Sequence, residues 1–205
     1  MKTVSIIFAT IITLSGLTSS QAYERKTLGK KVEGVALTES VLINELDNTQ
    51  LQAVASGIRK KYILVGINVY LGELLLPASV NWDKKPATVE ASPQVGILMS
   101  FLREVPAQKV SESFSEALNE NSIDTKAPEV SKFLDAVKKI GDIKKNESLL
   151  VARTQAKDGD KLMILVPNRF EEVISGPTGW SQNVLKIWTG KTSDKGLKGL
   201  QKAWF

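Results

Sequence analysis

One arginine stands where a charged side chain needs a partner. Arg59 follows Ser56-Gly57-Ile58 and immediately precedes a long apolar stretch, residues 61–76. This placement predicts a guanidinium group at the mouth of a buried strand, where an unpaired charge is costly. Because the planar guanidinium matches a carboxylate or phenolate oxygen, Arg59 is a candidate ligand-binding residue. The alternative is an ordinary ion pair at the surface.

Asn121 is a second candidate, because it is a polar residue on the apolar face of a predicted helix. Val110, Phe114 and Leu118 share that face at helical spacing. A buried amide requires hydrogen-bond partners, which a ligand could supply. The alternative is that Asn121 binds the last carbonyl groups of its own helix.

The absence of two residue types excludes the most familiar catalytic centres. The sequence contains no histidine and no cysteine, so it has no Ser-His-Asp triad, no thiolate nucleophile and no ordinary zinc site. Gly190-Lys191-Thr192 resembles the end of a phosphate-binding loop, but it ends a predicted helix instead of opening one. We therefore expect no metal and no cofactor. Any acid–base chemistry would use lysine, tyrosine, serine, arginine or carboxylate groups.

The first 22 residues have the features of a secretory signal peptide. Lys2 supplies a positive start, residues 4–17 form a short apolar run, and residues 20–22 fit the small-residue cleavage pattern. We predict a mature chain of one domain, residues 23–205, which is exported to the periplasm or secreted. No later apolar segment is long enough to span a membrane. The alternative is an N-terminal anchor that is not cleaved.

The charges indicate what the chain does not bind. The formal net charge is +5, and lysines and acidic residues are interspersed, which does not form a stripe for nucleic acid. The lysine-rich C-terminal segment, which ends in Trp204-Phe205, could contact a membrane surface. We favour the alternative, that its apolar side docks onto the domain. Nothing in the sequence favours a particular oligomeric state.

The hydrophobic pattern predicts strands joined by short turns, with helices inserted as blocks. Strands are expected over residues 32–37, 51–55, 95–103, 149–152, 161–166 and 171–174, and residues 61–76 are expected to form one strand or a pair of strands. Helices are expected over residues 107–121, 128–141, 180–190 and 194–204. Residues 23–31 read as a polar lead-in, and Asp158-Gly159 predicts a hairpin turn. Gly72 predicts a bulge or a place where another element packs on bare backbone. This order of elements predicts an α+β domain with a mostly antiparallel sheet.

Several short motifs, taken in order, resemble those of chalcone isomerase-like proteins. They are Ser56-Gly57-Ile58-Arg59, Asn68 to Pro77, Phe101-Leu102-Arg103-Glu104-Val105, Phe114 to Asn121 and Val184 to Gly190. The resemblance is greatest to the exported bacterial branch, in which a Gly-x-Arg segment precedes a strand rich in valine and tyrosine. It spans nearly all of residues 23–205.

The resemblance implies an open sandwich: a large, curved, mostly antiparallel sheet with helices packed on one face and a ligand cleft between them. Plant enzymes of the family close a flavanone ring by attack of a phenolate on an enone, without metal or cofactor. In those enzymes an arginine positions the nucleophile, and a threonine and a tyrosine hold a water on the ketone oxygen. An asparagine and a second hydroxyl residue complete the substrate contacts.

Carried over to this sequence, the resemblance retains only part of that site. Arg59 matches the family arginine, Asn121 matches the asparagine, and the threonine position falls near Tyr70. Phe114 stands where the enzymes have the tyrosine, and Ile187 stands where they have the second hydroxyl residue. Hydroxyl donors at a developing oxyanion typically lower the barrier by about 3 kcal/mol each. The resemblance therefore implies a site that has lost much of its catalytic power.

The retained arginine and the lost hydroxyl groups favour a non-catalytic binding domain over an enzyme. Related non-catalytic members bind fatty acids, so we expect a fatty acid or another amphiphilic acid whose acid group faces Arg59. Its tail would lie against Tyr70, Phe114, Ile187 and Trp188. One alternative is a weak lyase or isomerase on a phenolic or enone compound, with Tyr70 supplying a hydroxyl. Another is an envelope protein that binds a polypeptide in the cleft.

Overall fold

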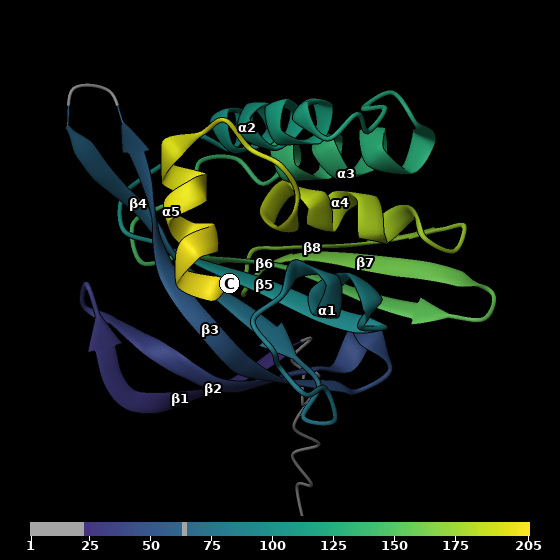
Figure 1. Ribbon diagram of the computed structural model, residues 1–205, viewed down its shortest axis with the longest axis horizontal. Coiled ribbons are helices and arrows are strands. Elements are labelled where there is room, and N and C mark those ends of the chain that lie inside the picture. The colour runs from purple at the N-terminus through teal and green to yellow at the C-terminus, as the bar shows by residue number, and fades with distance from the viewer. Residues whose placement is uncertain (1–22, 63–64) are drawn as a thin grey trace, which may run out of the picture.

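A single curled sheet dominates the computed structural model, which describes residues 23–62 and 65–205 (Figure 1). The predicted signal peptide, residues 1–22, lies outside the described residues. Eight strands pair in chain order, each antiparallel to the next. The strands are β1 (Tyr23–Val32), β2 (Val35–Ile43), β3 (Thr49–Tyr62), β4 (Gly66–Leu76), β5 (Gln94–Phe101), β6 (Ser148–Ala156), β7 (Gly159–Val166) and β8 (Phe170–Gly176).

Five α-helices accompany the sheet within the described residues. They are α1 (Pro86–Ala91), α2 (Ala107–Glu120), α3 (Pro128–Lys139), α4 (Trp180–Thr189) and α5 (Lys195–Trp204). In Figure 1, α2 to α5 lie along one face of the sheet, and β1 and β2 curve away beneath the other. The predicted α+β class with helices on one face is therefore confirmed. None of the described helices has the length and apolar character needed to cross a membrane.

The curl of the sheet creates two apolar cores. The larger lies between the sheet and the helices and contains, among others, Leu74, Phe114, Phe133 and Trp188. The smaller lies on the opposite face, where Ile43 of β2 packs near residues from β3 to β7. Strands alternate their side chains between the two faces, so one sheet supplies both cores.

The amphipathic helices and the later hairpin confirm their sequence predictions. In α2 and α3 the apolar residues repeat at helical spacing and are buried, and Pro128 occupies the first turn of α3. Between β6 and β7, Ala156 pairs with Gly159 across a two-residue loop, Lys157-Asp158. The local hydrophobic pattern was enough to predict these elements, because their apolar residues pack directly against the core.

The predictions for the first strands are wrong. Residues 23–31 form strand β1, because an edge strand can be held by backbone pairing without an apolar alternation. The strand predicted over 32–37 spans a hairpin turn, in which Glu33 and Gly34 have φ angles of 51° and 81°. Strand β3 extends well beyond 51–55, because it pairs with β4 along most of its length. The segment predicted over 61–76 is divided, because residues 61 and 62 end β3 and β4 begins at Gly66. The short helix α1 was not predicted.

Helix α5 packs closely on the sheet at two glycines, which have no side chains to hold it away. Gly57 of β3 and Gly72 of β4 are direct partners in the ladder. A Cβ on Gly57 would come within 2.7 Å of the Ala203 Cβ, and one on Gly72 within 3.2 Å of Leu200 and Trp204. The indole Nε1 of Trp204 also donates a hydrogen bond to the Gly72 carbonyl, at 3.3 Å. The prediction that another element packs on Gly72 is confirmed, and the apolar side of the terminal helix docks onto the domain.

Candidate functional site

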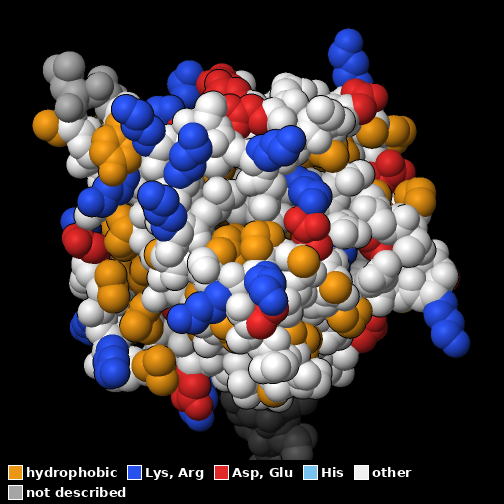
Figure 2. Space-filling model, in the orientation of Figure 1, with side chains coloured by type: hydrophobic (Ala, Val, Ile, Leu, Met, Phe, Trp, Pro, Cys, Tyr) orange, Lys and Arg blue, Asp and Glu red, His pale blue; other side chains and the backbone are white. Residues whose placement is uncertain are grey.

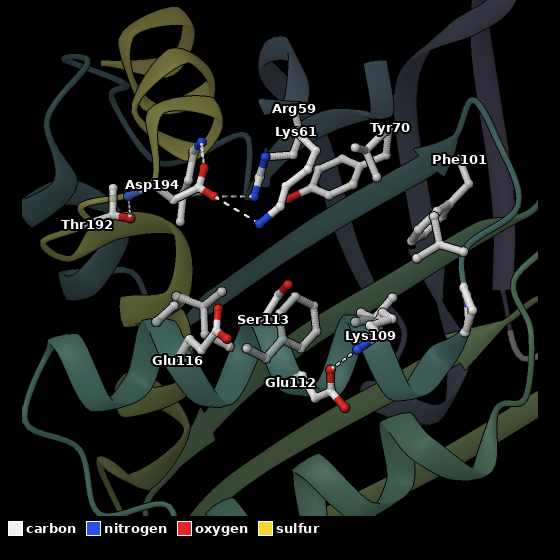
Figure 3. A pocket seen from close by; sticks show the side chains of 18 of the residues that line it. Arg59, Lys61, Tyr70, Phe101, Lys109, Glu112, Ser113, Glu116, Thr192 and Asp194 are labelled. Atoms are coloured by element: carbon white, nitrogen blue, oxygen red, sulfur yellow. Dashed lines mark hydrogen bonds and ion pairs between the residues drawn. The ribbon is translucent and has the colours of Figure 1, made fainter. Parts of the chain in front are cut away.

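A cavity of about 650 Å³ lies between α2, strands β3 to β5 and the segment that leads into α5 (Figure 3). Its apolar lining includes Tyr70, Phe101, Val110, Phe114, Ile187 and Leu197. Its charged lining includes Arg59, Lys61, Arg103, Glu112, Glu116 and Asp194. Its volume is typical of small-molecule sites, and its wall combines an apolar part with charged side chains of both signs.

Arg59 is the buried cation of this cavity. The residue is only 9% exposed, and its guanidinium Nη2 donates to the Asp194 carboxylate oxygen Oδ2 at 3.0 Å. Its other terminal nitrogen, Nη1, is buried and has no hydrogen-bond partner in the part of the chain that the structure describes. Lys61 lies farther from the same carboxylate, at 3.9 Å. Nη1 lies against Gly196 at the start of α5, so the nitrogen that Asp194 holds, Nη2, is the one that a ligand in the cavity would meet first.

Asp194 holds Arg59 and caps helix α5 at the same time. Its Oδ1 accepts a hydrogen bond from the Leu197 backbone N–H at 2.8 Å, which is the N-cap geometry. The close approach of the helix to β3 requires Gly196, because a Cβ there would collide with the Lys60 carbonyl oxygen and the Arg59 Nη1. The start of α5 is thus fixed against the cavity wall.

Tyr70 lies beside Arg59, because the two residues are partners in the β3–β4 ladder. The side chain packs against Phe101 with 5.7 Å between ring centroids, and Figure 3 shows its ring next to Arg59 and Lys61. Burial raises the pKa of the Tyr70 phenol above its ordinary value, and the Arg59 guanidinium opposes that rise. At neutral pH the group is therefore a neutral phenol that can donate a hydrogen bond.

Phe114 and Ile187 line the cavity and bring no hydroxyl group to it. Phe114 packs edge-on against Trp188, with 5.2 Å between ring centroids, and Trp188 is fully buried behind it. The structure thus brings four of the predicted site residues to one cavity: Arg59, Tyr70, Phe114 and Ile187.

Asn121 is not among the residues that line the cavity. Its amide nitrogen donates to the Ala117 carbonyl at 2.8 Å and to the Lys191 carbonyl at 2.9 Å, and its Oδ1 accepts from the Lys191 N–H at 2.7 Å. The bond to Ala117 is the alternative that the sequence left open, a side chain that binds its own helix end. Asn121 joins the end of α2 to the segment after α4, and we do not place it in the ligand site.

A family model for chalcone isomerase-like proteins matches residues 29–200 of this sequence. The chain belongs to the chalcone isomerase-like family. No curated protein sequence gives a match. Among solved structures, the chain is similar to the fatty-acid binding protein AtFAP1 of Arabidopsis thaliana, with 14% identity and a TM-score of 0.56. That match covers 88% of this chain and 97% of the plant protein, and at this identity it shows the shared fold.

In this chalcone isomerase-like domain, Arg59 faces polar residues that were not predicted from the sequence. Asp194 was recognised only as the start of a helix, although an aspartate at that position is an N-cap signal. Ser113 of α2 brings a hydroxyl to the cavity, one residue before Phe114. Figure 3 shows Ser113 and Glu116 projecting from α2 across the cavity from Arg59. Among the described residues, no cluster of three or more acidic groups is arranged to hold a metal ion.

Proposed function

We propose that this chain is an exported, non-catalytic chalcone isomerase-like domain that binds a fatty acid or a similar amphiphilic acid. The observation that carries the proposal is the Arg59 guanidinium, which is buried at the wall of the cavity with Nη1 unpartnered among the described residues. A permanently charged group in such a place favours an anionic ligand, because pairing offsets the free energy of burying the charge. The likeness in fold to a plant fatty-acid binding protein adds support.

The acid group of the ligand would take the place of one carboxylate oxygen of Asp194. Asp194 gives Arg59 its one hydrogen-bonded acid partner within the described residues, and its side chain is 32% exposed. A ligand carboxylate could bind Nη2 of Arg59 and accept from the neutral Tyr70 phenol. Asp194 could then turn toward solvent while its Oδ1 keeps the bond to Leu197.

The tail would lie along the apolar part of the same cavity. Phe101, Val110, Phe114, Ile187 and Leu197 border it from β5, α2, α4 and α5. Burial of each methylene group contributes about 0.8 kcal/mol, so the tail supplies most of the affinity and the acid group supplies orientation. The lost hydroxyl positions at Phe114 and Ile187 fit this role, because an alkyl chain needs no polar partner.

The direct test identifies the bound compound and then removes its anchor. We expect mass spectrometry of an organic extract of the purified protein to detect an amphiphilic acid. Arg59→Gln should weaken fatty-acid affinity roughly 10- to 100-fold, the loss expected for a charge-assisted hydrogen bond. Arg103→Gln is the matched control, because Arg103 lines the same cavity but is exposed. An empty extract together with equal affinities for both variants would reject the proposal.

Export is part of the proposal and has its own test. The predicted cleavage site precedes Tyr23, and removal of residues 1–22 leaves the matched domain intact. Intact-mass analysis of protein from cell fractions should find a chain that starts at Tyr23 in the envelope fraction or the medium. A full-length chain that remains in the cytosol would contradict export and leave the ligand proposal standing.

A second candidate is weak isomerase activity, which the neutral phenol of Tyr70 favours. That hydroxyl could donate to a ketone oxygen in the cavity, directly or through a water. A spectrophotometric assay with a chalcone tests this directly. Turnover that Tyr70→Phe removes would support an enzyme, and no turnover above background would exclude it.

A further inference from the structure

Five lysines gather on and around the outer side of helix α5. Lys195, Lys198 and Lys202 follow one another at spacings that place them on one side of the helix. Lys191 precedes the helix, and Lys61 of β3 lies beside its start. All five are exposed, and Figure 2 shows basic side chains gathered over α5. We call these five residues the lysine face.

The positive charge of the lysine face is largely uncompensated. Within the described residues, Lys61 is the one member with an ion pair, to Asp194 at 3.9 Å. Glu120 reaches the edge of the face through hydrogen bonds to Ser193. Five lysines against these two acids account for most of the formal net charge of +5. The rest of the molecule is close to neutral, so the positive electrostatic potential of the protein is strongest on this side.

Helix α5 cannot insert into a bilayer by its apolar side, because that side is already buried. Leu200 and Trp204 pack on the glycine pair of β3 and β4 and are 0% and 1% exposed. The helix therefore presents positively charged side chains to solvent. Exposed apolar side chains lie nearby, at the end of the β3–β4 hairpin. Tyr62 is 50% exposed and Val65 is 69% exposed. Figure 2 shows apolar side chains beside the basic ones at that corner.

The lysine face also borders the cavity. Lys61 and Asp194 line it, and Leu197 reaches it from the first turn of α5. A flat anionic surface that bound the face would therefore lie next to the cavity lining. This geometry is suited to an amphiphile that moves between a lipid layer and the protein.

We propose that the lysine face docks the protein onto the surface of an anionic lipid bilayer. A bilayer fits better than nucleic acid, because the face consists of lysines without an arginine fork and adjoins exposed apolar side chains. Binding is peripheral: lysines contact head groups, and Tyr62 and Val65 reach the interface. The proposed docking is independent of the proposed ligand. Only the transfer of a ligand between the bilayer and the cavity rests on the proposed function.

Vesicle co-sedimentation tests the docking. The probes are vesicles that contain phosphatidylglycerol and vesicles of phosphatidylcholine alone, each at low and high salt. We expect binding to the anionic vesicles only, and loss of binding at high salt. The variant Lys195→Gln/Lys198→Gln/Lys202→Gln should bind roughly 100-fold more weakly, because each lysine contributes about fivefold near an anionic surface.

Two further variants make the outcome decisive. Lys195→Arg/Lys198→Arg/Lys202→Arg should bind like the original protein, which separates charge from folding. Lys132→Gln/Lys145→Gln/Lys157→Gln removes three exposed lysines elsewhere and should bind nearly normally. Equal binding to neutral vesicles, equal loss in both glutamine variants, or binding of a homopolymer RNA in place of vesicles would overturn the proposal. The amount of extracted ligand should be the same in all variants, so a failure of docking is distinct from a failure of ligand binding.

Discussion

Two arginine–carboxylate pairs lie against the sheet, and they differ in how completely their polar atoms are used. In the first, Arg25 of β1 contacts Glu73 of β4 at 3.2 Å. Glu73 is 1% exposed and also accepts from the Thr38 N–H and the Thr38 hydroxyl, both at 2.7 Å. Arg25 donates in addition to Thr38 and to the Ala36 carbonyl. This cluster is closed, because its members satisfy one another.

The second pair, Arg59 with Asp194, is open. Arg59 is buried with one terminal nitrogen unpartnered within residues 23–62 and 65–205, and its partner carboxylate is partly exposed at the cavity. Residues of β3 and of the start of α5 form this pair, so it joins parts of the chain that are far apart in sequence. The difference separates two uses of an arginine beside the sheet: Arg25 holds strands together, and Arg59 remains at the cavity wall with a partner that a ligand could replace.

The largest effect should follow from breaking the closed cluster. Glu73→Gln removes the buried charge that Arg25 and Thr38 bind and leaves the partly buried Arg25 without its charge partner, so we expect the free energy of unfolding to fall by about 3 kcal/mol. Urea denaturation measures it, and fatty-acid affinity of the folded variant should stay unchanged. Glu39→Gln, which removes an exposed partner of Lys26, is the control and should cost less than about 1 kcal/mol. A ligand-binding defect in Glu73→Gln would show that the two regions are coupled.

The next largest loss of stability should come from the packing contact between helix α5 and strand β3. Gly57→Ala forces a Cβ to 2.7 Å from the Ala203 Cβ, and we expect a destabilisation of about 1–3 kcal/mol by overpacking. Gly29→Ala is the matched control in β1, because nothing lies within 4 Å of its added Cβ. Thermal unfolding compares the two. Equal stability of both variants would mean that α5 is not fixed by its contact with β3.

Each region also contains a tyrosine removed from water, Tyr23 in part and Tyr70 almost fully, which predicts loss of stability in alkali. Burial raises the pKa of Tyr23 to about 12 and raises that of Tyr70 as well. The unfolded chain loses these protons first, above its pKa of about 10, so stability is full below that pH and falls as pH rises toward about 12. Each tyrosine contributes a slope of up to about 1.4 kcal/mol per pH unit.

Phenylalanine variants separate the two contributions to that slope. Unfolding free energies as a function of pH should show a smaller alkaline loss in Tyr23→Phe and in Tyr70→Phe than in the original protein. Tyr62→Phe is the control, because Tyr62 is half exposed. An alkaline slope that neither buried variant reduces would contradict the shifted pKa values.

The smallest effect, on ligand affinity, should come from removing the resident carboxylate of the open pair. Asp194→Asn keeps an N-cap for α5 but no longer competes for Arg59, so fatty-acid affinity should rise about three- to tenfold. Fluorescence displacement of a bound lipid probe measures the change. Unchanged or weaker binding would indicate that the ligand does not use the nitrogen that Asp194 now holds.

The sequence predicted the elements whose information is local. The apolar residues of helices α2 and α3 repeat at helical spacing in the sequence, and Asp158-Gly159 is a typical hairpin-turn pair. Strand β1 was missed because its residues are mostly exposed and its order comes from pairing with β2. Long-range pairing likewise fixes the full length of β3, where Gly57 weakens any local strand signal.

The candidate site divides in the same way. Arg59 was recognised from its place before an apolar stretch, but nothing near it in sequence indicates Asp194, which the fold brings from 135 residues away. Asn121 was read as a site residue because it lies on an apolar helix face, and its partners are backbone groups of its own helix and of the segment after α4. A polar residue on an apolar helix face thus predicts that its side chain is removed from water, but not which group it binds.

Arg59 should select an acid group over an uncharged one, and two ligands that differ only in this group measure the preference. Calorimetric affinities would be measured for a long-chain fatty acid and for the alcohol of the same chain length, in the original protein and in Arg59→Gln. We predict that the original protein prefers the acid at least about tenfold and that Arg59→Gln binds acid and alcohol alike. Equal binding of the two compounds by the original protein, or a preference that survives in Arg59→Gln, would contradict the account.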